Sequence, residues 1–305
     1  MTVLAAARLG GLDPVLDLAS LAVPPAAVVS ALCAIRLLAR TRSATGKLIC
    51  GLCLVPGVVV WEPGLNPASC RPSLRVAWIN AHNPATARPI ADWIEREAPQ
   101  IVGVAEVDRN ALALRAYLAR RYPYRQSCLV NDHCSTLLYA ARRPRDAQGL
   151  ARGDPENRKA LSAVRMTFAG RTPASAVTVL AVHLSRPFPL RRQRRELAEL
   201  ETALSLSGDT IVMGDFNMPP RMQALRAFAA RNGLRVVPAG GPTWPTRLGG
   251  VKIGGLWQID QLLLGPGWRV AGVRRSPDLG SDHRGYVADL CRVAENGAGT
   301  GSDPE

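Results

Sequence analysis

The sequence predicts an α/β domain preceded by an apolar N-terminal region, and two observations lead to this prediction. From residue 66 onward, short apolar runs that end in glycine or a polar residue alternate with stretches whose apolar residues recur at helical spacing. Before residue 66, two long runs contain no charged residue. Because 47% of the residues are hydrophobic, the chain has enough apolar side chains for a core, and a wholly disordered protein is excluded.

Residues 1–65 are predicted to anchor the protein in a membrane as a transmembrane helical hairpin and linker. The uncharged run 18–35 is long enough to cross a bilayer, whereas the run 48–61 is shorter. The connection between them carries only basic charges, at Arg36, Arg40, Arg42 and Lys47. Since basic connections stay in the cytoplasm, such a hairpin would place everything after residue 65 on the other side. A buried helical hairpin in a soluble protein is the alternative.

Residues 66–294 are predicted to form the α/β domain, and residues 295–305, which are rich in Gly and acidic residues, a disordered tail. Apolar runs bounded by turn residues predict the strands, and spacings such as Ile90, Trp93 and Ile94 predict the helices. The predicted strands are 74–79, 101–105, 135–140, 161–168, 177–182, 210–214, 256–264, 268–273 and 286–290, and the predicted helices are 84–97, 110–121, 190–204 and 220–230.

Polar residues follow several of the predicted strands directly. Ligands of layered α/β folds bind at such strand ends, so these side chains are candidates for a functional site. A single polar residue at a strand end is more often a helix cap or a solvated group; it is their number and order along the chain that indicate a site. The residues that follow strands are Asn80, Glu106, His183, Asp215 and Asn217, and nearer the end of the chain come three further polar candidates, Asp260, Asp282 and His283.

In this order, the residues resemble the endonuclease/exonuclease/phosphatase family of Mg²⁺-dependent phosphoesterases. The specific motifs are Gly214-Asp215-Phe216-Asn217 and Ser281-Asp282-His283, which follow the strands ending at Asn80, Glu106 and His183. The resemblance covers residues 74–292 and implies a four-layer α/β/β/α sandwich of two packed mixed sheets. An apolar hairpin before this domain resembles a membrane-attached bacterial branch of the family.

The resemblance places all these residues in one cleft, and their chemistry suits phosphoester hydrolysis. Glu106, Asn80 and Asp282 are the predicted metal ligands, for Mg²⁺ or, as the second candidate, Mn²⁺, because hard cations prefer oxygen ligands. Asp215 is the predicted general base for an attacking water. Hydrogen bonds to the phosphoryl oxygens are assigned to His183, Asn217 and His283, the last held in one tautomer by Asp260. His82 departs from the family pattern, because some nuclease branches carry an acid there.

The net charge of +14 favours an anionic partner, either nucleic acid or a phospholipid or other small phosphorylated molecule. The predicted function is therefore a phosphoester hydrolase in the bacterial inner membrane, with its catalytic domain outside the cytoplasm. The alternative is a non-catalytic membrane-attached binding protein that retains the fold. The sequence makes no prediction of the oligomeric state.

Cys128 and Cys134 flank a short polar loop and are predicted to form a disulfide, which an oxidising compartment would permit. A zinc site that includes His133 is the alternative, although a second pair of ligands is missing nearby.

Overall fold

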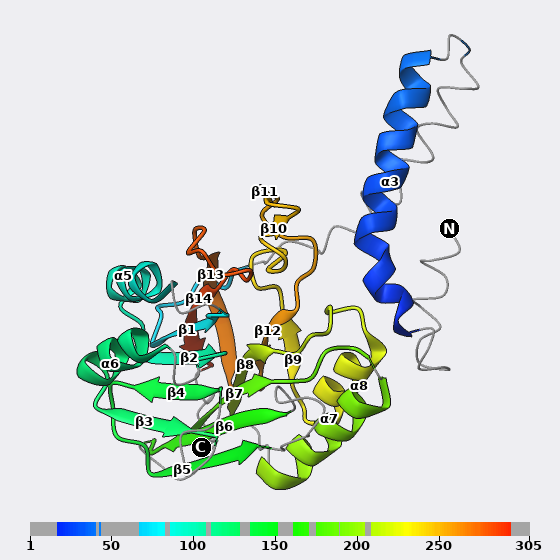
Figure 1. Ribbon diagram of the computed structural model, residues 1–305. Coiled ribbons are helices and arrows are strands. Elements are labelled where there is room, and N and C mark those ends of the chain that lie inside the picture. Colours follow the sequence, from blue (N-terminus) through cyan, green and yellow to red (C-terminus); the bar gives the residue numbers. More distant parts are fainter. Residues whose placement is uncertain are drawn as a thin grey trace, which may run out of the picture.

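The computed structural model describes residues 17–40, 43, 67–82, 86–107, 111–128, 135–151, 161–170, 175–188, 190–204 and 209–293. Two six-stranded sheets form the centre of the molecule (Figure 1). The first has the order β13-β14-β1-β2-β4-β3, with β1 (Leu74–Asn80), β2 (Ile101–Ala105), β3 (Tyr124–Ser127), β4 (Leu137–Ala140), β13 (Trp268–Arg275) and β14 (Tyr286–Arg292). The second has the order β5-β6-β7-β8-β12-β9, with β5 (Asp146–Ala151), β6 (Ser162–Phe168), β7 (Val177–His183), β8 (Thr210–Asp215), β9 (Arg235–Val237) and β12 (Asp260–Leu264).

The sheets pack face to face, and two helices cover the outer face of each. Between the sheets lies a core of buried apolar residues, among them Trp78, Met213 and Tyr286. Helices α5 (Ala87–Glu97) and α6 (Leu112–Arg121) pack on the first sheet through a second apolar cluster. A third cluster joins the second sheet to α7 (Leu190–Leu204) and α8 (Gln223–Arg231). This arrangement confirms the predicted four-layer sandwich of two mixed sheets.

Strand pairing brings the predicted site residues to one edge of the sandwich. In the first sheet, β1 and β2 are parallel, and Asn80 pairs with Ala105, the residue before Glu106. In the second, β7 and β8 are parallel, with His183 beside Asp215. Strand β12 runs antiparallel to β8 and places Asp260 opposite Asp215. Parallel strands end at the same edge, so these side chains converge there.

The N-terminal helix α3 (Ala19–Arg40) is joined to the domain at its first turn. The carboxylate of buried Asp17 accepts hydrogen bonds from the backbone N–H groups of Gln223 (2.6 Å) and Ala224 (3.0 Å), which begin α8. The segment Leu21–Arg40 is long and apolar enough to cross a membrane, as judged by length and composition alone. The second apolar run, 48–61, lies outside the described residues, so the transmembrane helical hairpin stays a prediction.

Two features of the fold differ from the sequence-based expectation. Strands β3, β5 and β9 and the small hairpin of β10 (Arg247–Leu248) and β11 (Val251–Lys252) were not predicted, and β12 begins at Asp260 rather than at residue 256. Most of these segments have half-exposed or exposed residues, so they lack the apolar run that marks a buried strand.

Disulfides include one pairing that the sequence analysis missed. Cys70, before β1, is bonded to Cys291 in β14, with Cα atoms 6.3 Å apart. The antiparallel neighbours β1 and β14 bring these two cysteines together. Cys128 is also in a disulfide. Its predicted partner Cys134 lies outside the described residues, as does His133 of the alternative zinc site.

Candidate active site

The candidate site lies at the edge where β1, β2, β7 and β8 end and β12 begins. Of the non-glycine residues with positive φ that the described chain contains, three belong to this edge: His82 (φ 49°), Glu106 (φ 54°) and Asn217 (φ 51°). Left-handed backbone is unfavourable for such residues and is found where surrounding contacts hold it, often at functional sites. The chain therefore bends sharply at the points where the site residues leave their strands.

Asp215 is the centre of the site. Its Oδ1 accepts the backbone N–H of Asn217 at 2.8 Å, which fixes the carboxylate in the turn after β8. Its Oδ2 accepts a hydrogen bond from Asn80 Nδ2 at 3.1 Å and lies 3.7 Å from Nε2 of both His183 and His283. One carboxylate oxygen thus faces three nitrogen-bearing side chains contributed by both sheets.

His283 is held by a carboxylate–tryptophan relay that crosses the two sheets. Its Nδ1 lies 2.8 Å from Asp260 Oδ2, while Asp260 Oδ1 accepts a hydrogen bond from Trp78 Nε1 at 2.8 Å. All three residues are buried. Gly103 makes room for Trp78, because a Cβ there would lie 2.8 Å from the indole ring. The relay fixes the imidazole so that Nε2 points toward Asp215 and Asp282.

The electrostatics of the pair suit acid–base chemistry. Burial raises the pKa of Asp215 to about 7, with the neighbouring Asp260 carboxylate adding to the rise and His283 opposing it. Burial by itself lowers the pKa of His283, but the Asp260 and Asp215 carboxylates outweigh this effect and raise the pKa to about 10. At neutral pH the site therefore contains a carboxylate near its titration point beside a cationic imidazole.

Glu106 and Asp282 form an acidic pair on the more exposed side of the site. His82 Nδ1 lies between them, 3.2 Å from Glu106 Oε2 and 3.7 Å from Asp282 Oδ1. Asp282 Oδ1 is buried and accepts no hydrogen bond from the residues described. Asn80 donates to Glu106 Oε1 at 3.3 Å, and its own oxygen accepts the backbone N–H of His82. Oxygen ligands of this kind suit a hard divalent cation.

Asp215, Asp260 and His283 form a second group with the right spacing for a metal, since their ligand atoms lie within 4.8 Å of one another. Both Asp260 oxygens already have hydrogen-bonding partners in Trp78 and His283. Asp282 Oδ1, by contrast, has no hydrogen-bonding partner among the described residues, so this oxygen is available to a cation.

All eight residues predicted from the sequence lie in this one cluster, although their individual roles stay predictions. Asn217 uses its Nδ2 to donate to the carbonyl of Leu184 at 2.9 Å, so in this structure the amide closes the loop between β7 and β8. Two further residues that support the site, Trp78 and Gln193, were not predicted from the sequence. Trp78 was within reach of sequence reasoning, because it lies two residues before Asn80 in one strand and so shares its face.

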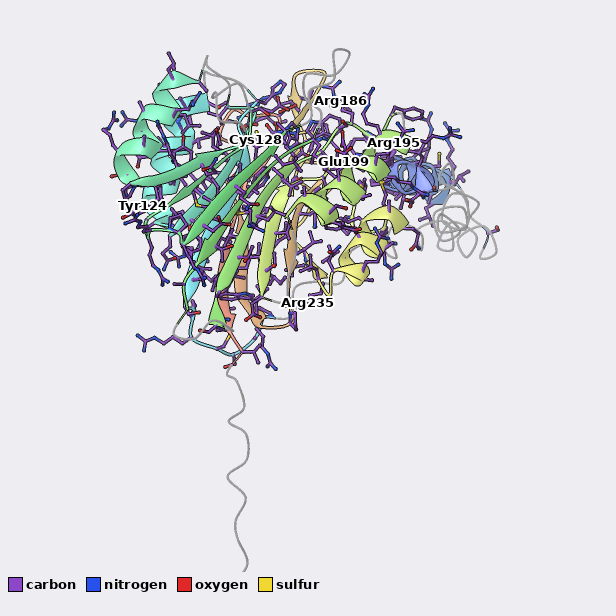
Figure 2. The ribbon with its side chains drawn as sticks, turned by 90° about the horizontal axis from the view of Figure 1, so that it is seen from below. Tyr124, Cys128, Arg186, Arg195, Glu199 and Arg235 are labelled. Atoms are coloured by element: carbon purple, nitrogen blue, oxygen red, sulfur yellow. A yellow bond between two sulfur atoms is a disulfide. The ribbon has the colours of Figure 1, made fainter. Side chains whose placement is uncertain are left out.

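Helix α7 supports the site through one buried side chain, Gln193, which lies among exposed arginines. Arg191, Arg194 and Arg195 are exposed to solvent. Gln193 is buried and its Nε2 donates to the carbonyls of Ser185 (2.6 Å) and Phe216 (3.2 Å). Figure 2 shows the end of the sandwich that carries Arg186, opposite the end that carries Arg235.

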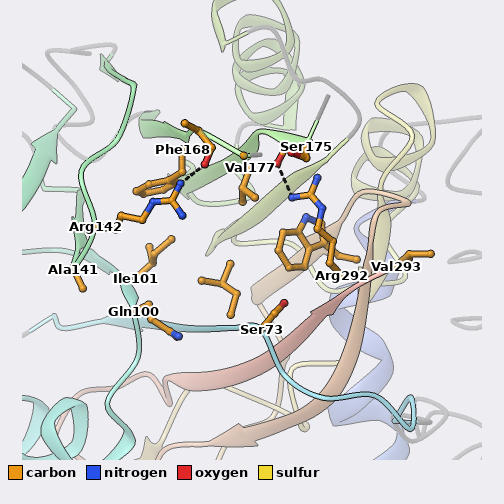
Figure 3. Close-up of a pocket in the computed structure, with 14 residues that line it drawn as sticks. Ser73, Gln100, Ile101, Ala141, Arg142, Phe168, Ser175, Val177, Arg292 and Val293 are labelled. Atoms are coloured by element: carbon orange, nitrogen blue, oxygen red, sulfur yellow. Dashed lines mark hydrogen bonds between the residues drawn. The ribbon is translucent and has the colours of Figure 1, made fainter. Parts of the chain in front are cut away.

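A cavity of about 1070 Å³ lies at the end of the sandwich opposite the candidate site (Figure 3). Its walls include the first residues of strands, Leu74 of β1, Ile101 of β2 and Val177 of β7, whereas the candidate site lies where these strands end. The guanidinium groups of Arg142 and Arg292 in its wall donate to the backbone carbonyls of Ala169 and Ser175. The cavity is therefore remote from the acid–base cluster.

Comparison with known proteins agrees with this geometry. The model of the Endonuclease/Exonuclease/phosphatase family matches residues 77–283. Solved structures with the same fold include an endonuclease/exonuclease/phosphatase protein from Beutenbergia cavernae (21% identity, 73% of this chain and 72% of that chain, TM-score 0.56). Others are TDP2 of D. rerio complexed with single strand DNA product (13%, 72% and 98%, 0.54) and sphingomyelinase C of Streptomyces griseocarneus (15%, 72% and 99%, 0.51). Comparison with curated protein sequences found no match.

Proposed function

Because this chain belongs to the endonuclease/exonuclease/phosphatase family, we propose that it is a membrane-attached, metal-dependent hydrolase of phosphoester bonds. The family comprises nucleases and other phosphoesterases, all of them hydrolases. The observation that carries the proposal is the environment of Asp215 Oδ2, a buried carboxylate oxygen with Asn80, His183 and His283 nitrogens within 3.7 Å. Such a site can accept a proton and stabilise negative charge at the same place.

In the proposed reaction, Asp215 acts as the general base. Asp215 Oδ2 takes a proton from a water molecule while the water oxygen forms its bond to phosphorus. The bond from phosphorus to the leaving oxygen breaks, and the leaving oxygen keeps the bonding electrons and takes up a proton from solvent. A pKa near 7 suits this role, because the carboxylate is basic enough to accept the proton and is largely ionised just above neutral pH. The backbone N–H of Asn217 holds the other oxygen and so orients the base.

His183 and His283 would stabilise the phosphoryl oxygens as charge develops. Both present Nε2 toward Asp215, and the Asp260 carboxylate keeps His283 protonated and oriented. Asn80 adds an amide donor, and its contacts to both Glu106 and Asp215 fix the distance between the acidic pair and the base. A side-chain amide oxygen has two lone pairs, so Asn80 can accept from His82 and still serve as a metal ligand.

Glu106 and Asp282, with Asn80, are the proposed ligands for Mg²⁺, with Mn²⁺ as a second candidate. The buried Asp282 oxygen that accepts no hydrogen bond from the described residues supports this assignment, as does the proximity of Glu106 through His82. A bound divalent cation would offset the negative charge of the phosphoryl group. The residues present therefore fit a hard cation.

Activity on a panel of substrates tests the proposal. The full chain, purified in detergent, is assayed on bis-p-nitrophenyl phosphate, a DNA oligonucleotide and phospholipids, with Mg²⁺, with Mn²⁺ and with EDTA. We expect hydrolysis of at least one substrate, lost with EDTA and in Asp215→Asn. Hydrolysis of none, or equal hydrolysis by Asp215→Asn, would refute the proposed function. Substrate binding without hydrolysis would favour the non-catalytic alternative.

A further inference from the structure

Residues 244–257, between β9 and β12, form a long loop that projects from the second sheet and has an apolar tip. Trp244 and Trp257 form an isolated antiparallel bridge at its base, with ring centroids 5.5 Å apart. Strands β10 and β11 follow, joined by Gly249-Gly250, which have φ of 54° and 84°. Leu248 is 61% exposed and Val251 is 66% exposed. The tip therefore presents the sequence Leu-Gly-Gly-Val to the surroundings, which is unfavourable in water.

Two basic residues lie next to this tip. Arg247 and Lys252 lie directly below Leu248 and Val251, and both pair with Asp278, at 2.9 and 3.0 Å. Two cations on one carboxylate leave a net positive charge, and the Lys252 side chain is 69% exposed. An apolar tip with two cations next to it matches the boundary between the acyl chains and the anionic headgroups of a bilayer.

The base of this loop is joined to the candidate membrane helix. Trp257 Nε1 donates a hydrogen bond to the carbonyl of Leu21, in the first turn of α3, at 2.7 Å. From this junction α3 and the β10–β11 hairpin extend from the domain on the same side (Figure 1). The hairpin tip therefore extends toward a bilayer that receives α3.

The base is also joined to the catalytic cleft. Trp244 Nε1 donates to Asp282 Oδ2 at 3.1 Å, and the Trp244 ring centroid lies 6.4 Å from that of His283. Next to the hairpin, the backbone N–H of Thr246 donates to the carbonyl of Asp282 at 2.9 Å. A surface that contacts the hairpin thus comes to lie beside Asp282 and His283.

We propose that the β10–β11 hairpin docks on the membrane that α3 enters and so presents the cleft to phosphoesters of lipid headgroups. The substrate part of this inference rests on the proposed function of the cleft, whereas the docking part does not. Both Leu248 and Val251 would enter the lipid, while Arg247 and Lys252 would lie among the headgroups. Nucleic acid, the other substrate class suggested by the net charge, would have no need of an apolar tip.

Photochemical labelling tests the docking without relying on activity. The full chain is reconstituted in vesicles of phosphatidylethanolamine and phosphatidylglycerol, with photoreactive p-benzoylphenylalanine in place of Val251. The control replaces Leu112, which is also 66% exposed but begins α6. We expect lipid adducts, detected by mass spectrometry, at position 251 and not at position 112. No adducts at 251, or equal adducts at both positions, would refute the docking.

Kinetics in the same vesicles test the substrate class. For Leu248→Asp/Val251→Asp we expect hydrolysis of a vesicle phospholipid to fall at least about tenfold, since two aliphatic side chains lose their lipid contact. Hydrolysis of soluble bis-p-nitrophenyl phosphate should stay within about twofold, and Leu112→Asp should change neither rate. Equal loss on both substrates would mean that the hairpin acts on the cleft itself and would refute the inference. Wild-type activity on DNA but not on lipid would refute the substrate class alone, and activity on no phosphoester would refute the proposed function instead.

Discussion

Residues from both sheets together set the pKa and the orientation of the Asp215 carboxyl group. Asn80 donates a hydrogen bond to it and the Nε2 atoms of His183 and His283 lie 3.7 Å from it, while a second acid, Asp260, has hydrogen-bonding partners of its own in Trp78 and His283. Burial raises the pKa of Asp215 to about 7 because the charged form loses its hydration. The group is therefore poised to accept a proton near neutral pH.

Removal of this base should abolish catalysis. We expect Asp215→Asn to lower turnover by at least about a hundredfold without unfolding the domain, because the amide cannot accept a proton from water. In the wild type, the rate should rise with pH through about 7, since Asp215 is protonated below its pKa and inactive in that form. The pH–rate profile of the residual activity of the variant should lack this rising limb. Near-normal turnover in the variant, with the limb retained, would assign the base to another group.

His82 provides a test of where the cation binds. Its imidazole lies between Glu106 and Asp282, where an additional carboxylate would add negative charge. We expect His82→Asp to tighten Mg²⁺ binding by about tenfold or more, measured by calorimetry. His82→Asn, which has the same shape without the charge, is the control. Equal affinities for the two variants would place the cation away from this acidic pair.

At the scale of the elements, the sequence predicted the interior strands well and the edges poorly. Strand 101–105 and helix 190–204 were predicted with the bounds that the structure shows, because buried apolar runs and helical periodicity mark them clearly. Strand β5, with the sequence Asp-Ala-Gln-Gly-Leu-Ala, lies at a sheet edge and has no such run. The packing of two sheets was inferred from the family resemblance, since periodicity alone also allowed a simple three-layer sheet.

The same limit applied to the candidate site. Residues directly after strands could be found from the chain, because the end of an apolar run is visible in the sequence. The contact of Trp78 with Asp260 joins the first sheet to the second, so it depends on how the sheets face each other. The pairing of Cys70 with Cys291 likewise depends on β14 lying beside β1.

An ion-pair network should make the first sheet sensitive to acid. Arg75 in β1 and Arg274 in β13 both pair with Asp289 in β14, and Arg274 also pairs with Glu97 at the end of α5. Burial raises the pKa of Asp289, but the hydrogen bonds from the two arginines outweigh this and hold it below its usual range. The lowered pKa means that this stabilisation is complete above the unfolded pKa and is lost as the pH falls through the folded pKa.

We expect Asp289→Asn to lower the free energy of unfolding at pH 7 by about 1–2 kcal/mol, a value reduced because both arginines are partly exposed. Below pH 4 the difference between variant and wild type should shrink, as measured by denaturant unfolding across pH. Asp146→Asn is the control, because Asp146 pairs with Arg165 but its side chain is 45% exposed. A difference that is constant with pH would show that the charge of Asp289 does not stabilise the sheet.

For the whole molecule, we propose that the domain lies outside the cytoplasm, and the disulfides and α3 support this proposal. A disulfide joins Cys70 to Cys291, and Cys128 is in another. Disulfides persist in oxidising compartments and are rare in the cytosol. The basic residues Arg36 and Arg40 lie at the C-terminal end of α3, remote from its junction with the domain. This polarity fits a helix whose far end remains in the cytoplasm.

The sidedness can be measured in intact cells with a membrane-impermeant alkylating reagent. In a Cys33→Ser background, which removes the free thiol of α3, we expect the Cys70 peptide to be labelled only after reduction with an impermeant reductant. Labelling that requires lysis of the cells but no reduction would place the domain in the cytoplasm.

The proposed hydrolysis of phosphoesters requires a metal held by Glu106, so the rate should depend on Mg²⁺ concentration in a way that this side chain determines. Glu106→Gln keeps the shape of the side chain and removes its charge. We predict that the variant needs at least about tenfold more Mg²⁺ for half-maximal activity, while its rate at saturating Mg²⁺ falls less. Superimposable Mg²⁺ curves for variant and wild type, or a rate that survives EDTA, would contradict the account.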